Sequence, residues 1–350
     1  MSIASGLVCP TPHAVADRVQ LGHGSGGTLT AALLRDHVFP VFDNPVLRQQ
    51  GDGAVIRSLG PTLVMSTDSF VVHPLEFPGG DIGLLAVHGT CNDLAMMGAH
   101  PRVITAGFVL EEGLEVALLD RVLASMGRAV RAAGIDLVAG DTKVVERGRA
   151  DGLYVCTTGL GARDPRLAPL PSRARPGDAI IVSGAVGRHG MAIMAAREGL
   201  AFEAEITSDT AALWPLVDCL AHHFGDQVHV LRDPTRGGVA SALTEIALAS
   251  RVGMRLAEER IPVPDPVAAA CAMLGLDPLY VANEGILLAI LPAEQADRAV
   301  ELLREHPIGA GAARIGTVVE EHPGIVTLQT PLGGTRVVDL LPGDQLPRIC

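Results

Sequence analysis

A stretch rich in Arg, Pro and Gly, residues 162–176, divides the chain into two halves that each contain strand-like and helix-like segments. The chain has 350 residues, 48% of them hydrophobic, which is enough for each half to bury its own core. We therefore expect an α/β protein of two domains, residues 1–165 and 176–340. Residues 341–350 include two prolines and a glycine and are expected to form a flexible tail ending in Cys350.

The charge and cysteine content narrow the possible functions. Asp and Glu number 39 against 27 Lys and Arg, a formal net charge of −12, which disfavours a nucleic-acid partner. No apolar run approaches the ~18 residues of a spanning helix, and residues 1–8 lack the basic segment of a signal peptide, so we expect a cytoplasmic protein without a membrane partner. The six cysteines form no C-x-x-C pair, which argues against a zinc or disulfide framework.

A glycine-rich run, Leu21-Gly-His-Gly-Ser-Gly-Gly-Thr28, precedes an apolar-periodic segment that includes Leu33 and Val38. Such a run predicts a loop that enters a helix and turns its N–H groups toward a phosphate. An ordinary N-terminal turn explains the same residues equally well.

Two acids are predicted at strand ends. Strands are expected at 54–59 and 62–67 around a Gly-Pro turn, with Asp52 before the first strand and Asp68 at the end of the second. Carboxylates at strand ends point to a shared rim that suits an ion and its ligand. Taken singly, each acid is better explained as a turn cap.

A polar pair, Asn92-Asp93, interrupts an apolar segment that is expected to be a helix from Ile82 to Met97, capped by Asp81 and stopped by Gly98. A buried polar pair is costly unless it is satisfied, and a bound cation would satisfy it. A solvated helix face is the alternative.

Further along the chain, residues 119–133 follow a helical period, and 136–145 read as a strand with Asp141 and Lys143 on one face. That pair is either a surface ion pair or a catalytic pair. In the second half, Asp233-Pro-Thr-Arg-Gly-Gly238 is expected to start a helix, and Glu284 is expected at the mouth of an apolar strand over 281–290.

These motifs together resemble the AIR synthase-related (PurM-like) ATP-binding superfamily. The matching stretches cover the chain from end to end: His23–Gly27, Ser66–Val72, Pro78–Gly83, Val87–Gly98, Gly140–Lys143, Asp233–Gly238, Ala282–Gly285 and Pro347–Cys350. The terminal Pro-Arg-Ile-Cys is similar to the HypE family, carbamoyl dehydratases that make the cyanide ligands of nickel–iron hydrogenase.

The resemblance implies a two-domain PurM-like architecture with mixed sheets and a homodimer that pairs through the N-terminal domain. It further implies that a HypF-type carbamoyltransferase loads a carbamoyl group onto Cys350, that ATP and Mg²⁺ drive its dehydration to a thiocyanate, and that cyanide passes to a HypC–HypD complex. A thiolate suits this carrier role because it is a good leaving group.

The resemblance also assigns residues. Cys350, Lys143 and Glu284 would be catalytic. The metal ligands would be Asp52, Asp68, Asp93 and Asp233. ATP would be bound by Gly24, Ser25, Gly26, Gly27, Asp68, Asn92, Asp93, Asp141 and Thr142.

Other functions use the same kind of site. A selenophosphate synthetase would carry a reactive Cys near the glycine loop, where residues 23–28 have none, and a thiamine-monophosphate kinase or AIR synthase gives no reason for a terminal Cys. A non-catalytic assembly scaffold that presents its tail is the non-enzymatic alternative, and absence of ATP turnover would favour it.

Overall fold

The computed structural model describes residues 17–25, 27–49, 53–56, 58–199, 205–340 and 348–350. Gly26, Asp52 and most of the predicted tail lie outside these ranges. Two mixed sheets form in the two halves of the chain, so the predicted α/β fold with mixed sheets is confirmed. None of the helices in the described ranges is long and apolar enough to span a membrane.

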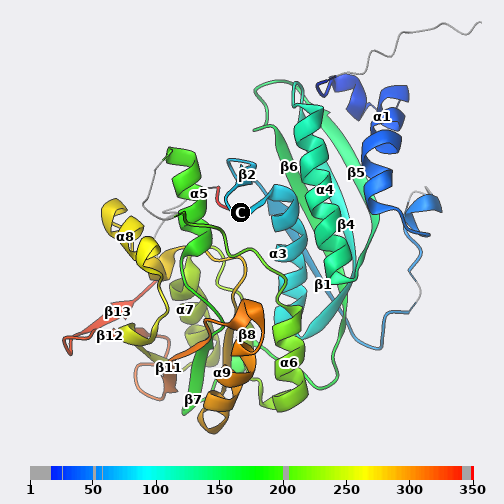
Figure 1. Ribbon diagram of the computed structural model, residues 1–350. Coiled ribbons are helices and arrows are strands. Elements are labelled where there is room, and N and C mark those ends of the chain that lie inside the picture. Colours follow the sequence, from blue (N-terminus) through cyan, green and yellow to red (C-terminus); the bar gives the residue numbers. More distant parts are fainter. Residues whose placement is uncertain (1–16, 26, 50–52, 57, 200–204, 341–347) are drawn as a thin grey trace, which may run out of the picture.

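The first half contains a four-stranded sheet in the order β1-β6-β4-β5. Its strands are β1 (Leu63–Phe70), β4 (Ala99–Glu111), β5 (Asp136–Val145) and β6 (Leu153–Arg163). Only β4 and β5 run parallel. Helices α3 (Ile82–Met96) and α4 (Val116–Ala133) lie side by side over one face of the sheet (Figure 1). The short strands β2 (Glu76–Phe77) and β3 (Gly80–Asp81) form a hairpin before α3.

The helix boundaries in this half follow from local chemistry. Asp81 caps α3 by accepting from the Leu84 N–H, and Gly98 takes the left-handed conformation just after the helix, as predicted. Gly134 ends α4 in the same way. The N-terminal segment forms short helical elements: η1 (Leu21–Gly24), α1 (Thr28–Leu33), η2 (Leu34–Val38), α2 (Phe39–Phe42) and η3 (Leu47–Gln49).

The face of the four-stranded sheet opposite α3 and α4 is open on β1. Exposed residues alternate with partly buried ones along this strand. Leu63 and Met65 are 52% and 69% exposed, which is unusual for apolar side chains of a strand.

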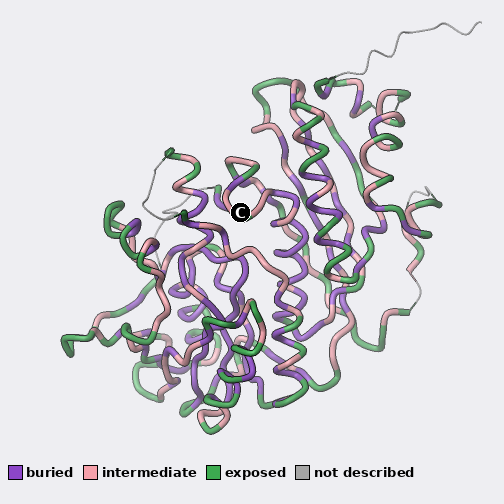
Figure 2. Tube along the Cα trace, in the orientation of Figure 1, coloured by how far each residue is buried: buried purple, intermediate pink, exposed green. Residues whose placement is uncertain are grey.

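The second half contains a seven-stranded sheet in the order β13-β12-β9-β11-β7-β10-β8. Its strands are β7 (Asp178–Val182), β8 (Val230–Arg232), β9 (Gly253–Ala257), β10 (Leu288–Pro292), β11 (Ala313–Val319), β12 (Val326–Gln329) and β13 (Thr335–Val338). Its helices are α5 (Arg188–Glu198), α6 (Trp214–Phe224), α7 (Gly238–Ser250), α8 (Asp265–Leu274) and α9 (Ala296–Arg304). The central strands β7 and β10 of this sheet are buried along almost their whole length (Figure 2).

Three expected elements differ from the structure. The described residues of 54–59 form no strand, because β1 pairs only with β6 and stands at the sheet edge. The strand predicted from 281 begins at Leu288, and Glu284 lies in the turn before it. The helix after Asp233 begins at Gly238, with Gly237 as its cap, since both glycines take positive φ.

Candidate active site

Four acidic side chains, here called the acidic cluster, come together between the two halves. Asp68 lies on β1 and Asp93 on α3, whereas Asp233 follows β8 and Glu284 precedes β10. The charges of Asp68, Asp93 and Asp233 all act on Glu284, so the four carboxyl groups are electrostatic neighbours. The Ser66 hydroxyl donates to Asp93 Oδ2 at 2.6 Å. Helix α3 brings acids from the two halves together because it packs on β1 and also on α6 of the second half.

The surroundings raise the pKa of three of these carboxyl groups. Burial, followed by the charge of Asp93, raises the pKa of Asp68 to about 6 and the pKa of Asp233 to about 7. Burial also raises the pKa of Glu284 well above its ordinary value, and the charge of Asp233 adds to the effect. Such a cluster favours protons or a cation, since either removes the repulsion between carboxylates.

Asn92 is buried beside the acidic cluster, and main-chain groups satisfy its side chain. Its Oδ1 accepts from the Leu213 N–H at 2.8 Å, and its Nδ2 donates to the carbonyls of Ala211 at 2.9 Å and Glu284 at 3.3 Å. The amide of Asn92 therefore ties α3 to two segments of the second half. The described structure gives this residue a bridging role, and its predicted contact with a nucleotide stays a prediction.

The C-terminal Cys350 lies beside the acidic cluster. The end of the chain is near the centre of the molecule, between β2, α5 and α3 (Figure 1). Arg236 Nη2 donates to Cys350 Sγ at 3.5 Å. Burial, followed by the charge of Glu284, raises the pKa of the Cys350 thiol to about 11, so the docked thiol is protonated at neutral pH.

Main-chain hydrogen bonds hold the last three residues in place. The Val71 N–H donates to the main-chain oxygen of Cys350 and the His73 N–H donates to the Arg348 carbonyl, each at 3.2 Å, which is an antiparallel pairing with the segment that follows β1. Between them, the Ile349 side chain is 4% exposed and joins a hydrophobic cluster built from residues of both halves. The end of the chain is thus a built part of the site.

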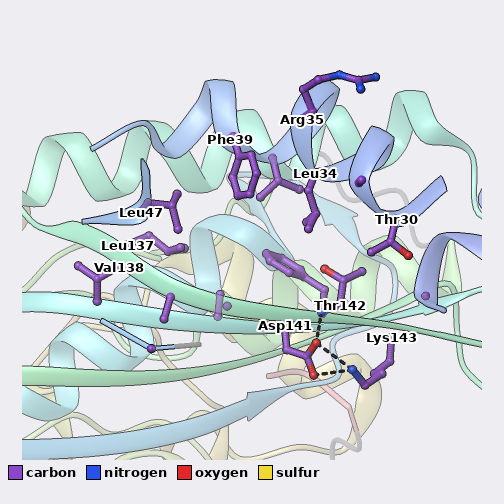
Figure 3. A pocket seen from close by; sticks show the side chains of 18 of the residues that line it. Thr30, Leu34, Arg35, Phe39, Leu47, Leu137, Val138, Asp141, Thr142 and Lys143 are labelled. Carbon is purple, nitrogen blue, oxygen red and sulfur yellow. Dashed lines mark hydrogen bonds and ion pairs between the residues drawn. The ribbon is translucent and has the colours of Figure 1, made fainter. Parts of the chain in front are cut away.

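Gly24, Asp141, Thr142 and Lys143 lie elsewhere, at a pocket of about 610 Å³ between the N-terminal helices and β5 (Figure 3). Lys143 Nζ donates to Asp141 Oδ1 at 2.8 Å, and the two side chains are 62% and 67% exposed. Because β5 and β1 are opposite edges of the sheet, the width of the sheet separates Lys143 from Asp68. One chain therefore brings the predicted site residues together in two places.

The pocket has apolar walls and a polar rim. Figure 3 shows its apolar side chains from both the helices and β5, with Asp141 and Lys143 at the edge and Arg35 pointing away. The apolar lining includes Leu34, Val38, Phe39, Val46, Leu47, Phe108, Leu137 and Val138. A flat ring with polar substituents fits such a pocket.

The glycine loop approaches β5 closely. A Cβ at Gly24 would stand 2.4 Å from the Val144 nitrogen, so no larger residue fits there without a shift. Ser25 Oγ donates to the Gly22 carbonyl at 2.9 Å, and Gly27 caps α1. The loop therefore reaches the pocket rim through Gly24.

A metal site is only partly assembled. Within the described ranges, no three His, Cys, Asp or Glu side chains are grouped to hold a metal ion, and Asp52 lies outside those ranges. Mg²⁺ usually takes only one or two carboxylates from a protein and its other ligands from phosphates and water. The mutual repulsion at Asp68 and Asp233 fits a cation held in this shared manner.

Several residues at the site were not predicted. Arg236 belongs to the Asp233–Gly238 motif, but nothing in the sequence around it indicates that it lies close to the terminal thiol. His189 contacts the tail, and the partly buried Asp209 accepts from the Glu284 and Gly285 N–H groups. These contacts join segments far apart in the chain, which a periodicity does not reveal.

Comparisons with known proteins identify the family. The AIR synthase related protein N-terminal domain matches residues 50–162, and its C-terminal domain matches residues 175–329. The carbamoyl dehydratase HypE of Azotobacter vinelandii is 52% identical over 332 residues, which are 95% of this chain and 97% of that protein.

Solved structures agree. A hydrogenase maturation protein HypE in complex with ATP has a TM-score of 0.90 at 50% identity, over 95% of this chain and 99% of that chain. A HypE–HypF complex has a TM-score of 0.77 at 42% identity, over 90% of this chain and 100% of that chain. With such identity over nearly the whole length, the chain belongs to the HypE family of carbamoyl dehydratases among the AIR synthase-related proteins.

Proposed function

We propose that this chain uses ATP to dehydrate a carbamoyl group carried on Cys350, leaving a thiocyanate that supplies cyanide to the iron of a nickel–iron hydrogenase. The carbamoyl oxygen attacks the γ-phosphorus of ATP and ADP leaves. Loss of both nitrogen protons and of the phosphorylated oxygen as inorganic phosphate then forms the C≡N bond. The oxygen of the lost water thus ends on phosphate, and sulfur keeps its bond to carbon.

The observation that carries this proposal is the docked terminal thiol. Cys350 Sγ accepts a hydrogen bond from Arg236, and burial, followed by the charges of Glu284 and Asp68, raises the pKa of its thiol. A carbamoyl group on this sulfur would extend toward the same groups. Of the proposed alternatives, a phosphotransferase for a small molecule gives no account of this docking.

Each group at the cluster has a proposed task. Glu284 removes nitrogen protons, because a buried carboxylate with a raised pKa is a strong base once ionised. Carboxylates from the set Asp68, Asp93 and Asp233 would hold Mg²⁺ together with the ATP phosphates, and the ion would neutralise charge there. ATP binds with its phosphates toward this cluster, and the glycine loop that closes over them comes from the second copy of the homodimer proposed below, because one chain places Gly24 at the β5 pocket on the far side of the sheet.

The proposed partners follow from the carrier chemistry. A HypF-type carbamoyltransferase loads Cys350, and the solved HypE–HypF complex of a relative supports this step. A HypC–HypD complex receives the cyanide. Both steps need the thiol outside the protein, so the tail leaves the docked position twice in each cycle.

We further propose a homodimer formed through the open sheet face. Leu63 and Met65 are exposed on this face, and a second copy would cover them. A two-fold axis parallel to the strands lays β5 of one copy over β1 of the other, which brings Lys143 of one copy toward Asp68 of its partner. Lys143 would then assist catalysis across the interface.

Intact mass spectrometry tests the function. The protein is loaded by a HypF-type enzyme with carbamoyl phosphate and then given ATP and Mg²⁺, alongside a Cys350→Ala variant. We expect a carbamoyl adduct on Cys350 that becomes lighter by one water only with ATP, and no adduct on the variant. ATP hydrolysis without an adduct would favour a small-molecule enzyme, and an absence of both would favour a scaffold.

A further inference from the structure

His189, in the first turn of α5, makes direct contact with the tail. Its Nε2 lies 2.6 Å from the Ile349 carbonyl oxygen, and its Nδ1 lies 2.8 Å from Ser208 Oγ. The side chain is fully buried. The Phe77 ring packs against the imidazole edge to face, with centroids 5.6 Å apart. Packing and hydrogen bonds thus hold this ring in one orientation.

The partners also determine which ring nitrogen carries the proton. Burial lowers the pKa of His189, so the ring is neutral and has one N–H. The Ile349 carbonyl can only accept, so Nε2 carries the proton and Nδ1 accepts from the Ser208 hydroxyl. Ser208 Oγ accepts in turn from the Thr210 N–H at 3.1 Å and lies 2.6 Å from Thr210 Oγ1. Every polar atom in this chain of contacts has a partner of the right kind.

The contact fixes the peptide that carries the reactive cysteine. The Ile349 carbonyl and the Cys350 nitrogen and Cα belong to one planar peptide unit, so holding the oxygen also orients Cys350. Arg197 Nη2 donates to the Arg348 carbonyl at 2.6 Å, one residue earlier. All these contacts are with main-chain atoms, so they do not depend on whether the sulfur is free, carbamoylated or cyanated.

We propose that His189 is a positioning residue, which holds the Ile349 carbonyl so that each return of the tail brings the Cys350 sulfur to the same place beside Glu284 and Arg236. Its effect on dehydration rests on the proposed function. Its effect on docking does not, because docking can be measured on the free protein without ATP or a carbamoyl group. The two effects can therefore be measured separately.

The test compares His189→Gln with His189→Asn. A glutamine amide nitrogen reaches the place of Nε2 and still donates to the Ile349 carbonyl, whereas an asparagine amide ends near Nδ1 and leaves that carbonyl without its donor. Docking is measured as the rate at which iodoacetamide alkylates Cys350, read from the mass of the C-terminal peptide. Dehydration is measured as ATP-dependent loss of water from protein that has already been carbamoylated.

For His189→Asn we expect Cys350 alkylation to rise about tenfold, since one buried hydrogen bond is lost. Dehydration slows by a similar factor, and loading by the HypF-type enzyme is unchanged because it acts on the undocked tail. His189→Gln stays near wild type in both measurements. Alkylation of Cys219, on α6, serves as an internal reference and stays constant.

His229→Asn is the control for loss of a buried histidine. His229 is also buried, but it pairs with Asp178 at 2.8 Å. We expect it to lower the thermal midpoint without exposing Cys350. Equal alkylation of the Asn and Gln variants at position 189, or a wild-type Cys350 that reacts as fast as a free peptide, would overturn the proposal. The expected alkylation pattern without ATP-dependent loss of water in any variant, wild type included, would support positioning and reject the dehydratase function.

Discussion

At Glu284, the proposed removal of nitrogen protons is linked to ligand binding. Burial, followed by the charges of the neighbouring acids, raises its pKa, so without a cation the folded protein keeps this proton to a higher pH than an ordinary glutamate does. A cation and a nucleotide that neutralise the neighbours would lower this pKa and release the base when the substrate is in place. The same repulsion that destabilises the empty cluster thereby links base activation to ligand binding.

Replacing Glu284 with glutamine removes the base but keeps its size. We expect Glu284→Gln to accept a carbamoyl group at the wild-type rate and to dehydrate it at least about 100-fold more slowly, as for loss of a general base. Single-turnover mass spectrometry on loaded protein measures both steps. Glu301→Gln changes an exposed acid on α9 in the same way and is expected to have no effect. Unchanged dehydration by Glu284→Gln would assign proton removal to another group.

The acidic cluster also predicts a pH dependence of stability in the metal-free protein. Asp68 and Asp233 have raised pKa values of about 6 and about 7, mainly because of burial, whereas in the unfolded chain both ionise near 3.8. Between these values the folded state binds more protons, so the free energy of unfolding falls as pH rises from about 4 to about 7. Urea unfolding in EDTA at both ends of this range measures the slope.

Asp233→Asn isolates the contribution of one acid to this slope. Asparagine cannot ionise, so the variant should lose less stability over the same pH range than the wild type. Asp297→Asn, at an exposed position of α9, should keep the wild-type slope. If Asp233→Asn also keeps that slope, the proposed origin of the pH dependence is wrong.

Helix α3 is the element that joins the two halves of the site. It contributes Asp93 to the acidic cluster, packs on β1, and reaches the second half through the Asn92 amide. Gly89 on the same helix approaches Glu284: a Cβ there would lie 3.9 Å from Glu284 Oε2 and would collide with Phe70. A small residue and an amide at these positions allow a polar site to form on an otherwise apolar helix.

Changing Asn92 to aspartate keeps the shape and reverses the polarity of one atom. The new oxygen faces the carbonyls of Ala211 and Glu284, so two hydrogen bonds are replaced by repulsion. We expect the free energy of unfolding to fall by about 3 kcal/mol in chemical denaturation. Gln49→Glu, the same chemical change at an exposed amide, should cost little. Equal stability of Asn92→Asp and wild type would show that the amide does not bridge the halves.

The sequence predicts those parts of the fold that depend on local chemistry. Both ends of α3 were predicted because Asp81 and Gly98 act within one turn of the helix. The described residues of 54–59 do not form the expected strand, because a strand needs a partner that propensity does not supply. Asp93 and Glu284 stand out in the sequence as polar residues in apolar segments. That they lie close together depends on how the two halves pack, which local sequence does not indicate.

At the scale of the whole molecule, the proposed role of Lys143 must be reconciled with its position in one chain. In one chain it pairs with Asp141 at the pocket beside β5, and the width of the sheet separates it from Asp68. The apolar Met65 is exposed on the open face of the same sheet. A homodimer through this face would explain both observations, because it buries Met65 and places Lys143 in the partner's site.

Mixed dimers test this arrangement. Lys143→Ala and Glu284→Ala chains with different tags are coexpressed, and thiocyanate on Cys350 is measured by mass for each chain. If Lys143 acts across the interface, one site of each mixed dimer is intact, so the Lys143→Ala chain forms thiocyanate although neither variant does so alone. Random pairing predicts about a quarter of the wild-type yield. If Lys143 acts within its own chain, both sites of the mixed dimer are defective and no thiocyanate forms.

Met65→Glu on both chains tests whether the recovery, meaning thiocyanate formation in mixed dimers, depends on the open sheet face. Burying two carboxylates in an apolar interface is costly, so the variant should elute as a single chain of 36.3 kDa in light scattering and the recovery should disappear. Leu332→Glu places the same charge at a 99% exposed position of the second half and should leave both the dimer and the recovery intact. Recovery that survives Met65→Glu would show that the two chains meet through another surface.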